Sequence, residues 1–243
     1  MLMYDISVKD LGFNYDDGTR AIDSISVDIA FGESVGIAGG NGAGKSTLVH
    51  HLNGYFIPQQ GTISINDTVL TKKTQEAIRK IVGLVFQNAD DQLFMSSVYD
   101  DIMFGPQNMG VQGDTLITLV EKTLNDLGLW HIKDKAPVHL SAGQKRFCAF
   151  ATVLVMEPKI LVMDEPTSDL DPRHRRQLME LVRRLDITKI TVSHDLDFIW
   201  DTCERTIILN NGRIVADGVT KVVLSDERLL QENGLELPLR LQK

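Results

Sequence analysis

The start of the chain alternates hydrophobic and polar positions. Apolar side chains fall largely at every second residue over two stretches, a period typical of half-buried strands. The turn residues Asp16-Asp17-Gly18 lie between the stretches. We therefore predict that an antiparallel β edge opens the domain. The apolar positions are Ile6 and Val8 in the first stretch and Ile22, Ile25, Val27 and Ile29 in the second.

A strand, a glycine-rich loop and a helix follow one another in the next segment. Residues 34–38 form a short apolar strand that runs into the glycines, and residues 45–52 can continue directly as a helix. Residues 62–70 predict another hairpin. Residues 82–86 predict a compact strand that ends on Gln87.

Residues 88–156 have a helical pattern instead. Asp114 is expected to cap one helix, and Ser141 is expected to cap a second helix that runs to Met156. We expect this segment to be an inserted helical subdomain. The apolar residues of the first helix recur at helical spacing and are Leu116, Leu119, Val120, Leu124 and Leu127.

Strands of the parallel type return after this segment. They are expected at residues 160–163 and 188–192, separated by a helix that begins at Pro172, because proline suits the first helical turn. A hairpin over residues 206–216 and a short helix near residues 226–231 end the chain. This alternation of strands and helices predicts an α/β fold.

The length of 243 residues suits one large α/β domain with a subdomain. We expect residues 1–87 and 157–243 to form its core and residues 88–156 to form the helical part. The hydrophobic fraction of 43% and the charged fraction of 24% are ordinary for globular proteins, so the composition suggests neither disorder nor a fibrous repeat.

Composition and charge also bear on location and partners. No apolar run approaches the roughly 20 residues that cross a bilayer. The start, Met1-Leu2-Met3-Tyr4-Asp5, has no basic region and no long apolar segment, so we expect no secretory signal and a cytoplasmic protein. The net charge of −8 argues against a nucleic-acid partner. Cys148 and Cys203 lack the spacing of a metal site or disulfide and are expected to be buried, reduced thiols.

A phosphate-loop pattern is present at Gly39-Gly40-Asn41-Gly42-Ala43-Gly44-Lys45-Ser46. The glycines let backbone N–H groups surround the phosphates of ATP, and the N-terminus of the following helix adds a favourable dipole. We expect Lys45 to neutralise the β- and γ-phosphates, Ser46 to give its hydroxyl to Mg²⁺, and Thr47 to lie in the same site. The simpler interpretation, a flexible glycine-rich turn, is disfavoured by the strand and helix on either side.

Two adjacent carboxylates follow the predicted strand at residues 160–163. Sheets of the α/β type place ligands at the carboxyl ends of their strands, so Asp164 suits Mg²⁺ directly or through water. Glu165 is expected to point the other way and to act as the general base toward the attacking water. Taken alone, this strand end has a simpler interpretation as a solvated acidic turn. Together with the phosphate loop, the catalytic interpretation is favoured.

The segment Leu140-Ser141-Ala142-Gly143-Gln144 resembles the signature "LSGGQ" of ABC ATPases. The resemblance implies a second anion site, in which the Ser141 hydroxyl, the Gly143 backbone and a helix N-terminus approach the γ-phosphate held by the opposite subunit, with Gln144 beside them. The simpler interpretation is a serine-capped helix. Ala142 replaces a glycine of the signature, and Phe147 stands where a basic residue is frequent. A positive φ at Ala142 would cost about 1 kcal/mol and weaken dimer closure.

The resemblance to ABC ATPases extends over almost the entire chain. It implies that Gln87 is the Q-loop glutamine, which senses Mg²⁺ and water, and that residues 168–171 are the D-loop. It also implies that His194 is the switch histidine, which hydrogen-bonds the γ-phosphate, and that Tyr15 stacks on adenine. Each of these residues alone has a structural interpretation, as a loop, surface or core side chain. Their joint order supports the resemblance.

Within this family, residues 85–94 are similar to the segment "FQNPDDQLF" of energy-coupling-factor transporter ATPases. Residues 101–106 and 234–239 resemble the cobalt and nickel members. The resemblance implies a subunit that hydrolyses ATP with Mg²⁺ to energise an importer, with cobalt or nickel ions preferred to a vitamin such as biotin or riboflavin. The ATPase motifs are also compatible with an ordinary ABC importer ATPase and with a soluble ABC ATPase outside transport.

The partners implied by the resemblance are an integral membrane coupling subunit and a substrate-binding membrane subunit, with this chain peripheral at the cytoplasmic face of the membrane. A homodimer is expected because the catalytic motifs are complete. We further expect Asp90 and Asp91 to meet arginines of a docked coupling helix. A simpler interpretation is that both are solvated acids or that one caps the next short helix.

Overall fold

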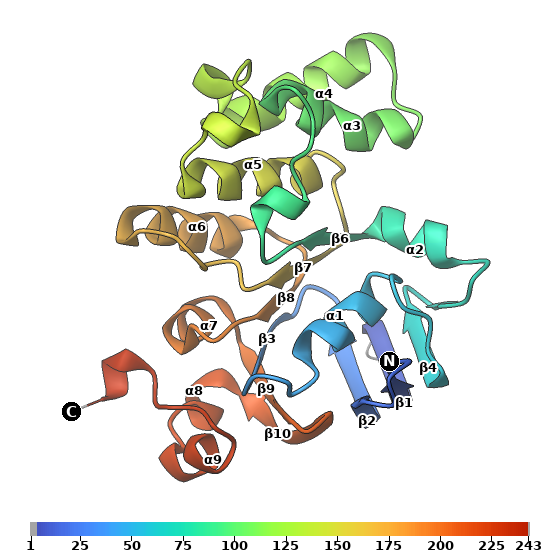
Figure 1. Cartoon of the computed structure of the whole chain (residues 1–243), viewed down its shortest axis with the longest axis vertical. Helices are drawn as coiled ribbons and strands as arrows, with labels where there is room; N and C mark the ends of the chain where they lie inside the picture. The colour runs from blue at the N-terminus through green and yellow to red at the C-terminus, as the bar shows by residue number, and fades with distance from the viewer. Residues whose placement is uncertain (1–3, 243) are drawn as a thin grey trace.

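The computed structural model describes residues 4–242. The first three residues of the start segment, where we expect no secretory signal, lie outside this range. The described part contains two β-sheets and helices that cover them (Figure 1). No helix within it is both long enough and apolar enough to cross a bilayer.

The first sheet is antiparallel and has the strand order β2-β1-β4-β5. The predicted opening strands pair with each other, with Val8 opposite Val27 in the register. Their alternate apolar side chains are buried because one face of the sheet packs on the core. The bounds are β1 (Tyr4–Asn14), β2 (Arg20–Ala30), β4 (Gln60–Ile65) and β5 (Thr68–Val69).

The second sheet has six strands in the order β10-β9-β3-β8-β7-β6. Five of them run parallel, and β10 pairs antiparallel with β9. Every residue of β3, β6, β7 and β8 is buried, as expected for short apolar strands covered on both faces. The bounds are β3 (Ser34–Gly39), β6 (Val82–Val85), β7 (Ile160–Asp164), β8 (Thr188–Val192), β9 (Arg205–Asn210) and β10 (Arg213–Val219).

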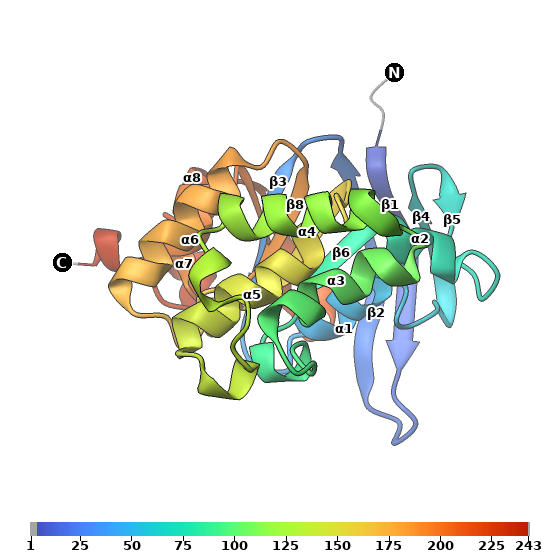
Figure 2. The ribbon, with the colours of Figure 1, turned by 90° about the horizontal axis from the view of Figure 1, so that it is seen from above.

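The helices cover the parallel sheet and extend the molecule at both ends. Helix α1 contacts strands of both sheets, whereas α3, α4 and α5 pack on one another at the end opposite α8 and α9 (Figure 1). Seen from above, the antiparallel sheet and α6 lie on opposite sides (Figure 2). The bounds are α1 (Lys45–Leu52), α2 (Gln75–Ile81), α3 (Val98–Asn108), α4 (Gly113–Asp126), α5 (Ala142–Leu154), α6 (Pro172–Arg184), α7 (Leu196–Thr202), α8 (Thr220–Val223) and α9 (Glu227–Glu232), with 3₁₀ turns η1 (Ala89–Asp91), η2 (Trp130–Ile132), η3 (Pro137–His139) and η4 (Leu239–Leu241).

The structure corrects some details of the predicted helices. Asp114 is not an N-cap, because α4 already begins at Gly113; its carboxylate lies in the first turn, where the helix dipole favours it. Helix α5 ends at Leu154 rather than Met156, and α2, α7 and α8 were not predicted. Ala142 is the first residue of α5 and does not have a positive φ, so the conformational cost that a positive φ would impose does not arise.

Both cysteines are buried free thiols, as predicted. Cys148 lies in α5, and Cys203 directly follows α7. Burial raises the pKa of Cys148 to about 12 and that of Cys203 to about 11. The reactive thiolate is therefore disfavoured at both positions.

Candidate nucleotide site

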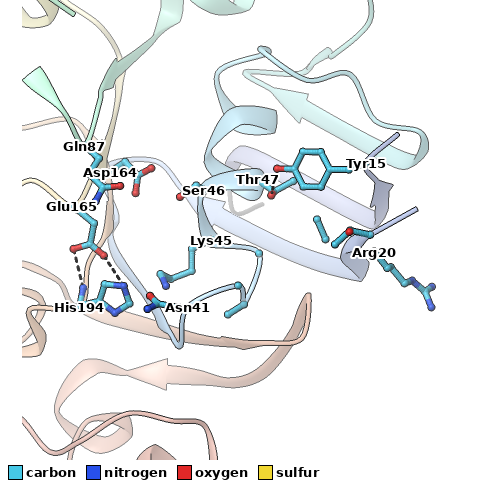
Figure 3. A pocket seen from close by; sticks show the side chains of 15 residues that line it. Tyr15, Arg20, Asn41, Lys45, Ser46, Thr47, Gln87, Asp164, Glu165 and His194 are labelled. Atoms are coloured by element: carbon cyan, nitrogen blue, oxygen red, sulfur yellow. Dashed lines mark hydrogen bonds and ion pairs between the residues drawn. The ribbon is translucent and has the colours of Figure 1, made fainter. Parts of the chain in front are cut away.

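A cleft of about 370 Å³ opens at the carboxyl ends of the parallel strands. Strand β3 leads into the glycine loop, β6 leads to Gln87, β7 ends at Asp164, and β8 leads to His194. Because the carboxyl ends of parallel strands share one edge of a sheet, these distant segments meet around one space (Figure 3). The predicted residues that line it are Tyr15, Asn41, Gly42, Ala43, Gly44, Lys45, Ser46, Thr47, Gln87, Asp164, Glu165 and His194.

The backbone of the glycine loop has the conformation that only glycine adopts readily. Gly42 has a φ of 75° and Gly44 a φ of 99°, both in the left-handed region. A Cβ at Gly44 would also collide with the carbonyl of Ala21 in β2. The two glycines therefore permit the tight passage from β3 into α1.

Lys45 lies at the start of α1, and its side chain folds back over the loop. Its Nζ donates hydrogen bonds to the carbonyl oxygens of Gly39 at 2.8 Å and Gly40 at 3.0 Å. Burial lowers the pKa of Lys45, while the charges of Glu165 and Asp164 act in the opposite direction. The ammonium is thus held at the loop, where a phosphate group of ATP would bind.

Asp164 and Ser46 provide a set of oxygen donors suited to Mg²⁺. Burial raises the pKa of Asp164. The hydrogen bond with the neighbouring Ser46 hydroxyl and the nearby positive charges act in the opposite direction. Among the described residues, the buried Oδ1 of Asp164 has no hydrogen-bond partner. A carboxylate and a hydroxyl are hard ligands of the kind Mg²⁺ prefers, and the unpaired oxygen leaves one of them available.

Glu165 points away from Asp164, as predicted, toward the segment after β8 (Figure 3). Its Oε2 accepts hydrogen bonds from the Ser193 hydroxyl and from the backbone N–H of His194, both at 3.0 Å. Nε2 of His194 lies 3.3 Å from Oε1 of Glu165. The φ of 44° at Glu165 is unusual for a residue with a side chain, and it turns the chain at the end of β7.

Tyr15 lies at the edge of the cleft and is partly exposed. Its hydroxyl is 2.8 Å from Oγ1 of Thr47, and its ring meets Phe13 edge to face, with centroids 5.3 Å apart. The hydroxyl contact fixes the ring beside α1. This position suits the stacking role that the resemblance implies for Tyr15.

The signature residues lie outside this cleft, at the start of α5. Ser141 and Gln144 form a reciprocal capping box: Gln144 N donates to Ser141 Oγ at 3.3 Å, and Ser141 N donates to Gln144 Oε1 at 3.1 Å. A Cβ on Gly143 would lie 2.5 Å from the ring of His174 in α6. The structure therefore confirms the serine cap and leaves the predicted anion site separate from the cleft of its own chain.

The structure also places residues that sequence reasoning missed. Thr19, in the turn between β1 and β2, and Arg20 and Ala21, at the start of β2, line the cleft. The Ser193 hydroxyl holds Glu165, a contact that no local pattern in the sequence indicates. Arg146 is buried in α5, and a cation inside an apolar helical stretch was a signal available in the sequence.

Asp90 and Asp91 differ in their surroundings. Asp90 forms an ion pair with Lys145 at 2.6 Å, whereas the cap of η1 is Asn88, whose Oδ1 accepts from the N–H of Asp90 at 3.1 Å. Neither aspartate therefore caps η1, and the next helix, α3, is capped by Ser97. Since Asp90 is engaged within its own chain, Asp91 is the better placed of the two to meet a partner.

Comparison with known proteins places this geometry in context. The family described as ABC transporter matches residues 22–168. A putative ABC transporter ATP-binding protein of Geobacter sulfurreducens is 48% identical, covering 98% of this chain and 95% of the relative. The energy-coupling factor transporter ATP-binding protein EcfA of Carboxydothermus hydrogenoformans is 42% identical, covering 96% and 87%. The solved structure of cbiO1 from Clostridium perfringens, part of the ABC transporter complex cbiONQ, is 39% identical with a TM-score of 0.83, covering 94% of each chain.

Proposed function

Because this chain belongs to the ABC transporter ATP-binding proteins and is an ATPase of the energy-coupling-factor type, we propose that it energises an importer of cobalt or nickel ions. The observation that carries the ATPase assignment is the meeting of Lys45, Ser46, Asp164 and Glu165 around one cleft. The preference for a metal ion rests on residues 101–106 and 234–239, which resemble the cobalt and nickel members.

The geometry supports in-line attack of water on the γ-phosphate of ATP. Lys45 and the loop N–H groups bind the phosphates, and Ser46 and Asp164 would hold Mg²⁺, which supplies charge neutralisation when bound. Glu165 would accept a proton from the attacking water, and His194, whose Nε2 lies 3.3 Å from Oε1 of Glu165, would hydrogen-bond the γ-phosphate. Gln87, in the loop after β6, lines the same cleft and would contact the Mg²⁺ ion and the attacking water.

We propose a homodimer in which each ATP lies between the phosphate loop of one chain and the signature of the other. The separation of Ser141, Gly143 and Gln144 from their own cleft supports this arrangement. The relatives of the energy-coupling-factor type further support an integral membrane coupling subunit and a substrate-binding membrane subunit as partners, with this chain at the cytoplasmic face.

The surface proposed for the membrane coupling subunit lies next to Gln87. Phe86, Phe94 and Phe104 are exposed there, and the rings of the last two meet edge to face with centroids 5.1 Å apart. Asp91 adds a carboxylate for an arginine of the docked helix. An apolar patch with acidic residues in the same segment fits an amphipathic, basic coupling helix.

The test is uptake by the intact complex of this chain with its membrane subunits in ATP-loaded vesicles. We expect ATP-dependent uptake of labelled Co²⁺ or Ni²⁺, and none with chains that carry Lys45→Ala. Uptake of labelled biotin or riboflavin in place of the metal ions would refute the proposed solute and keep the importer. Absence of any association with the membrane subunits would refute the importer role itself.

A further inference from the structure

Arg146 is a buried cation in the middle of α5, with only 3% of its surface exposed. Nη1 donates to the carbonyl of Phe86 at 2.8 Å, and Nη2 donates to the carbonyls of Gln87 at 2.6 Å and Ser168 at 3.4 Å. Burial lowers the pKa of Arg146, and the negative charge of Asp169 opposes this. A buried charge is costly unless it is well hydrogen-bonded, so these contacts define the place of the side chain.

The carbonyls that Arg146 binds belong to two loops of the nucleotide site. One is the loop after β6, which carries Gln87 into the cleft. The other is the turn after β7, in which Ser168 N donates to the carbonyl of Glu165 at 3.2 Å. Arg146 therefore connects the signature helix with the segments that bear Gln87 and the proposed general base Glu165.

Two more side chains fasten the loop after β6 to the same helix. Gln92 accepts from the N–H of Phe86 at 3.1 Å, and its amide donates to the carbonyl of Ala149 at 2.7 Å and to Thr152 Oγ1 at 2.8 Å. Lys145 pairs with Asp90 at 2.6 Å. Residues 86–92 are thus held against α5 at several points, and among these three side chains it is Arg146 that also reaches the turn after Glu165.

We infer that Arg146 is a positioning residue that couples the two ATP sites of the dimer. It holds Gln87, which serves the site of its own chain, against the helix whose Ser141 serves the site of the partner chain. The inference rests on the proposed composite dimer. Loss of the guanidinium leaves the carbonyls of Phe86 and Gln87 without their donor, and the loop no longer follows the movement of α5.

The test compares Arg146→Met and Arg146→Lys with the wild-type chain. We expect Arg146→Met to bind labelled ATP within about twofold of wild type, because Lys45 and its loop are untouched, while kcat falls about tenfold or more through misplacement of Gln87. The dependence of rate on ATP concentration should lose any sigmoidal shape, because the sites no longer communicate. Arg146→Lys should be intermediate, since one ammonium replaces a fork of donors.

Arg205→Met is the matched control. Arg205 lies at the start of β9, away from the cleft, and also donates to a main-chain carbonyl, that of Asp28 at 2.9 Å. The substitution Arg205→Met should lower the midpoint temperature of thermal unfolding, while kcat stays near the wild-type value. An unchanged kcat in Arg146→Met would overturn the inference. An equal loss of kcat in Arg205→Met, at the same midpoint of thermal unfolding as Arg146→Met, would also overturn it. The proposed dimer is tested separately by whether ATP holds Glu165→Gln chains together, a measurement that does not involve Arg146.

Discussion

At the scale of single residues, neighbouring carboxylates acquire different surroundings. Asp164 faces Ser46, and burial raises its pKa. Glu165 faces Ser193 and His194, which donate to the same oxygen. Two adjacent acids in different environments are suited to different tasks, metal binding for the first and proton transfer for the second.

We predict that Glu165→Gln binds ATP but hydrolyses it about 10²–10⁴-fold more slowly, because general-base assistance is lost while the phosphate loop is intact. ATP should then hold the dimer closed, which size-exclusion chromatography detects. Glu76→Gln, an exposed change in α2, should leave the rate unaltered. Wild-type turnover in Glu165→Gln would remove Glu165 from its assigned role.

At the scale of elements, an ion pair connects α6 to α7 beside His194. Asp195 caps α7 by accepting from Phe198 N at 2.9 Å, and Arg175 of α6 donates to both of its oxygens, at 2.6 and 2.8 Å. Burial acts to raise the pKa of Asp195. The hydrogen bonds from Arg175 and from the N–H of Phe198 outweigh this effect and keep the pKa below its usual 3.8. The pair thereby fixes the segment that contains His194.

We predict that Asp195→Asn lowers the free energy of unfolding by about 1.5–3 kcal/mol at neutral pH. A carboxyl whose pKa is lower in the folded than in the unfolded state stabilises the protein above the unfolded pKa, so this contribution is lost as the pH falls below 3.8. Urea unfolding of the wild type and the variant at several pH values measures this difference in the free energy of unfolding. The exposed variant Asp186→Asn should show no such difference, and a pH-independent loss in Asp195→Asn would contradict the assignment.

The packing of α5 on α6 leads to another prediction. Gly143→Ala should reduce the free energy of unfolding by about 1–3 kcal/mol and slow ATP hydrolysis, because the new methyl group meets the ring of His174. Adding His174→Ala makes room for the methyl group and should restore much of the free energy of unfolding and of the hydrolysis rate. The measurement is a double-mutant cycle with His174→Ala alone as the control. Purely additive effects would show that contact with His174 is not the cause.

At the scale of the whole molecule, the predicted chemistry is divided between two surfaces. The cleft contains Lys45 and Glu165, whereas Ser141 lies at the start of the signature helix, outside the cleft. A dimer with composite sites would bring the two surfaces together. The fold class predicted from the sequence, an ABC ATPase core with an antiparallel β part and a helical part, is confirmed by the family match and the structural neighbours.

We predict that mixing Lys45→Ala chains with Ser141→Arg chains restores ATPase activity. In each heterodimer one site contains both defects and the other contains neither, whereas each mutant homodimer has two damaged sites. Activity is measured after co-expression with two affinity tags, and each single variant is the control. No gain in heterodimers that are shown to form would argue against sites shared between chains.

The local parts of the site could be predicted from the order of residues along the chain. The glycine loop between β3 and α1, the acids at the end of β7 and the capped start of α5 each depend on residues close together in the chain, so spacing and side-chain type were sufficient to predict them. The alternation at Ile6 and Val8 likewise predicted half-buried strands, because one face of their sheet covers the core.

The contacts between groups that are distant in the chain could not be predicted in this way and depend on how the elements pack. The contacts of Glu165 with Ser193, of Arg146 with Gln87 and of Asp90 with Lys145 all join segments separated by at least one other element. The first contact follows from the sheet order, which places β7 beside β8, and the other two follow from the packing of α5 on β6 and η1. Local patterns contain no information on that order, because hydrophobic periodicity specifies which face is buried but not which strand lies next to it.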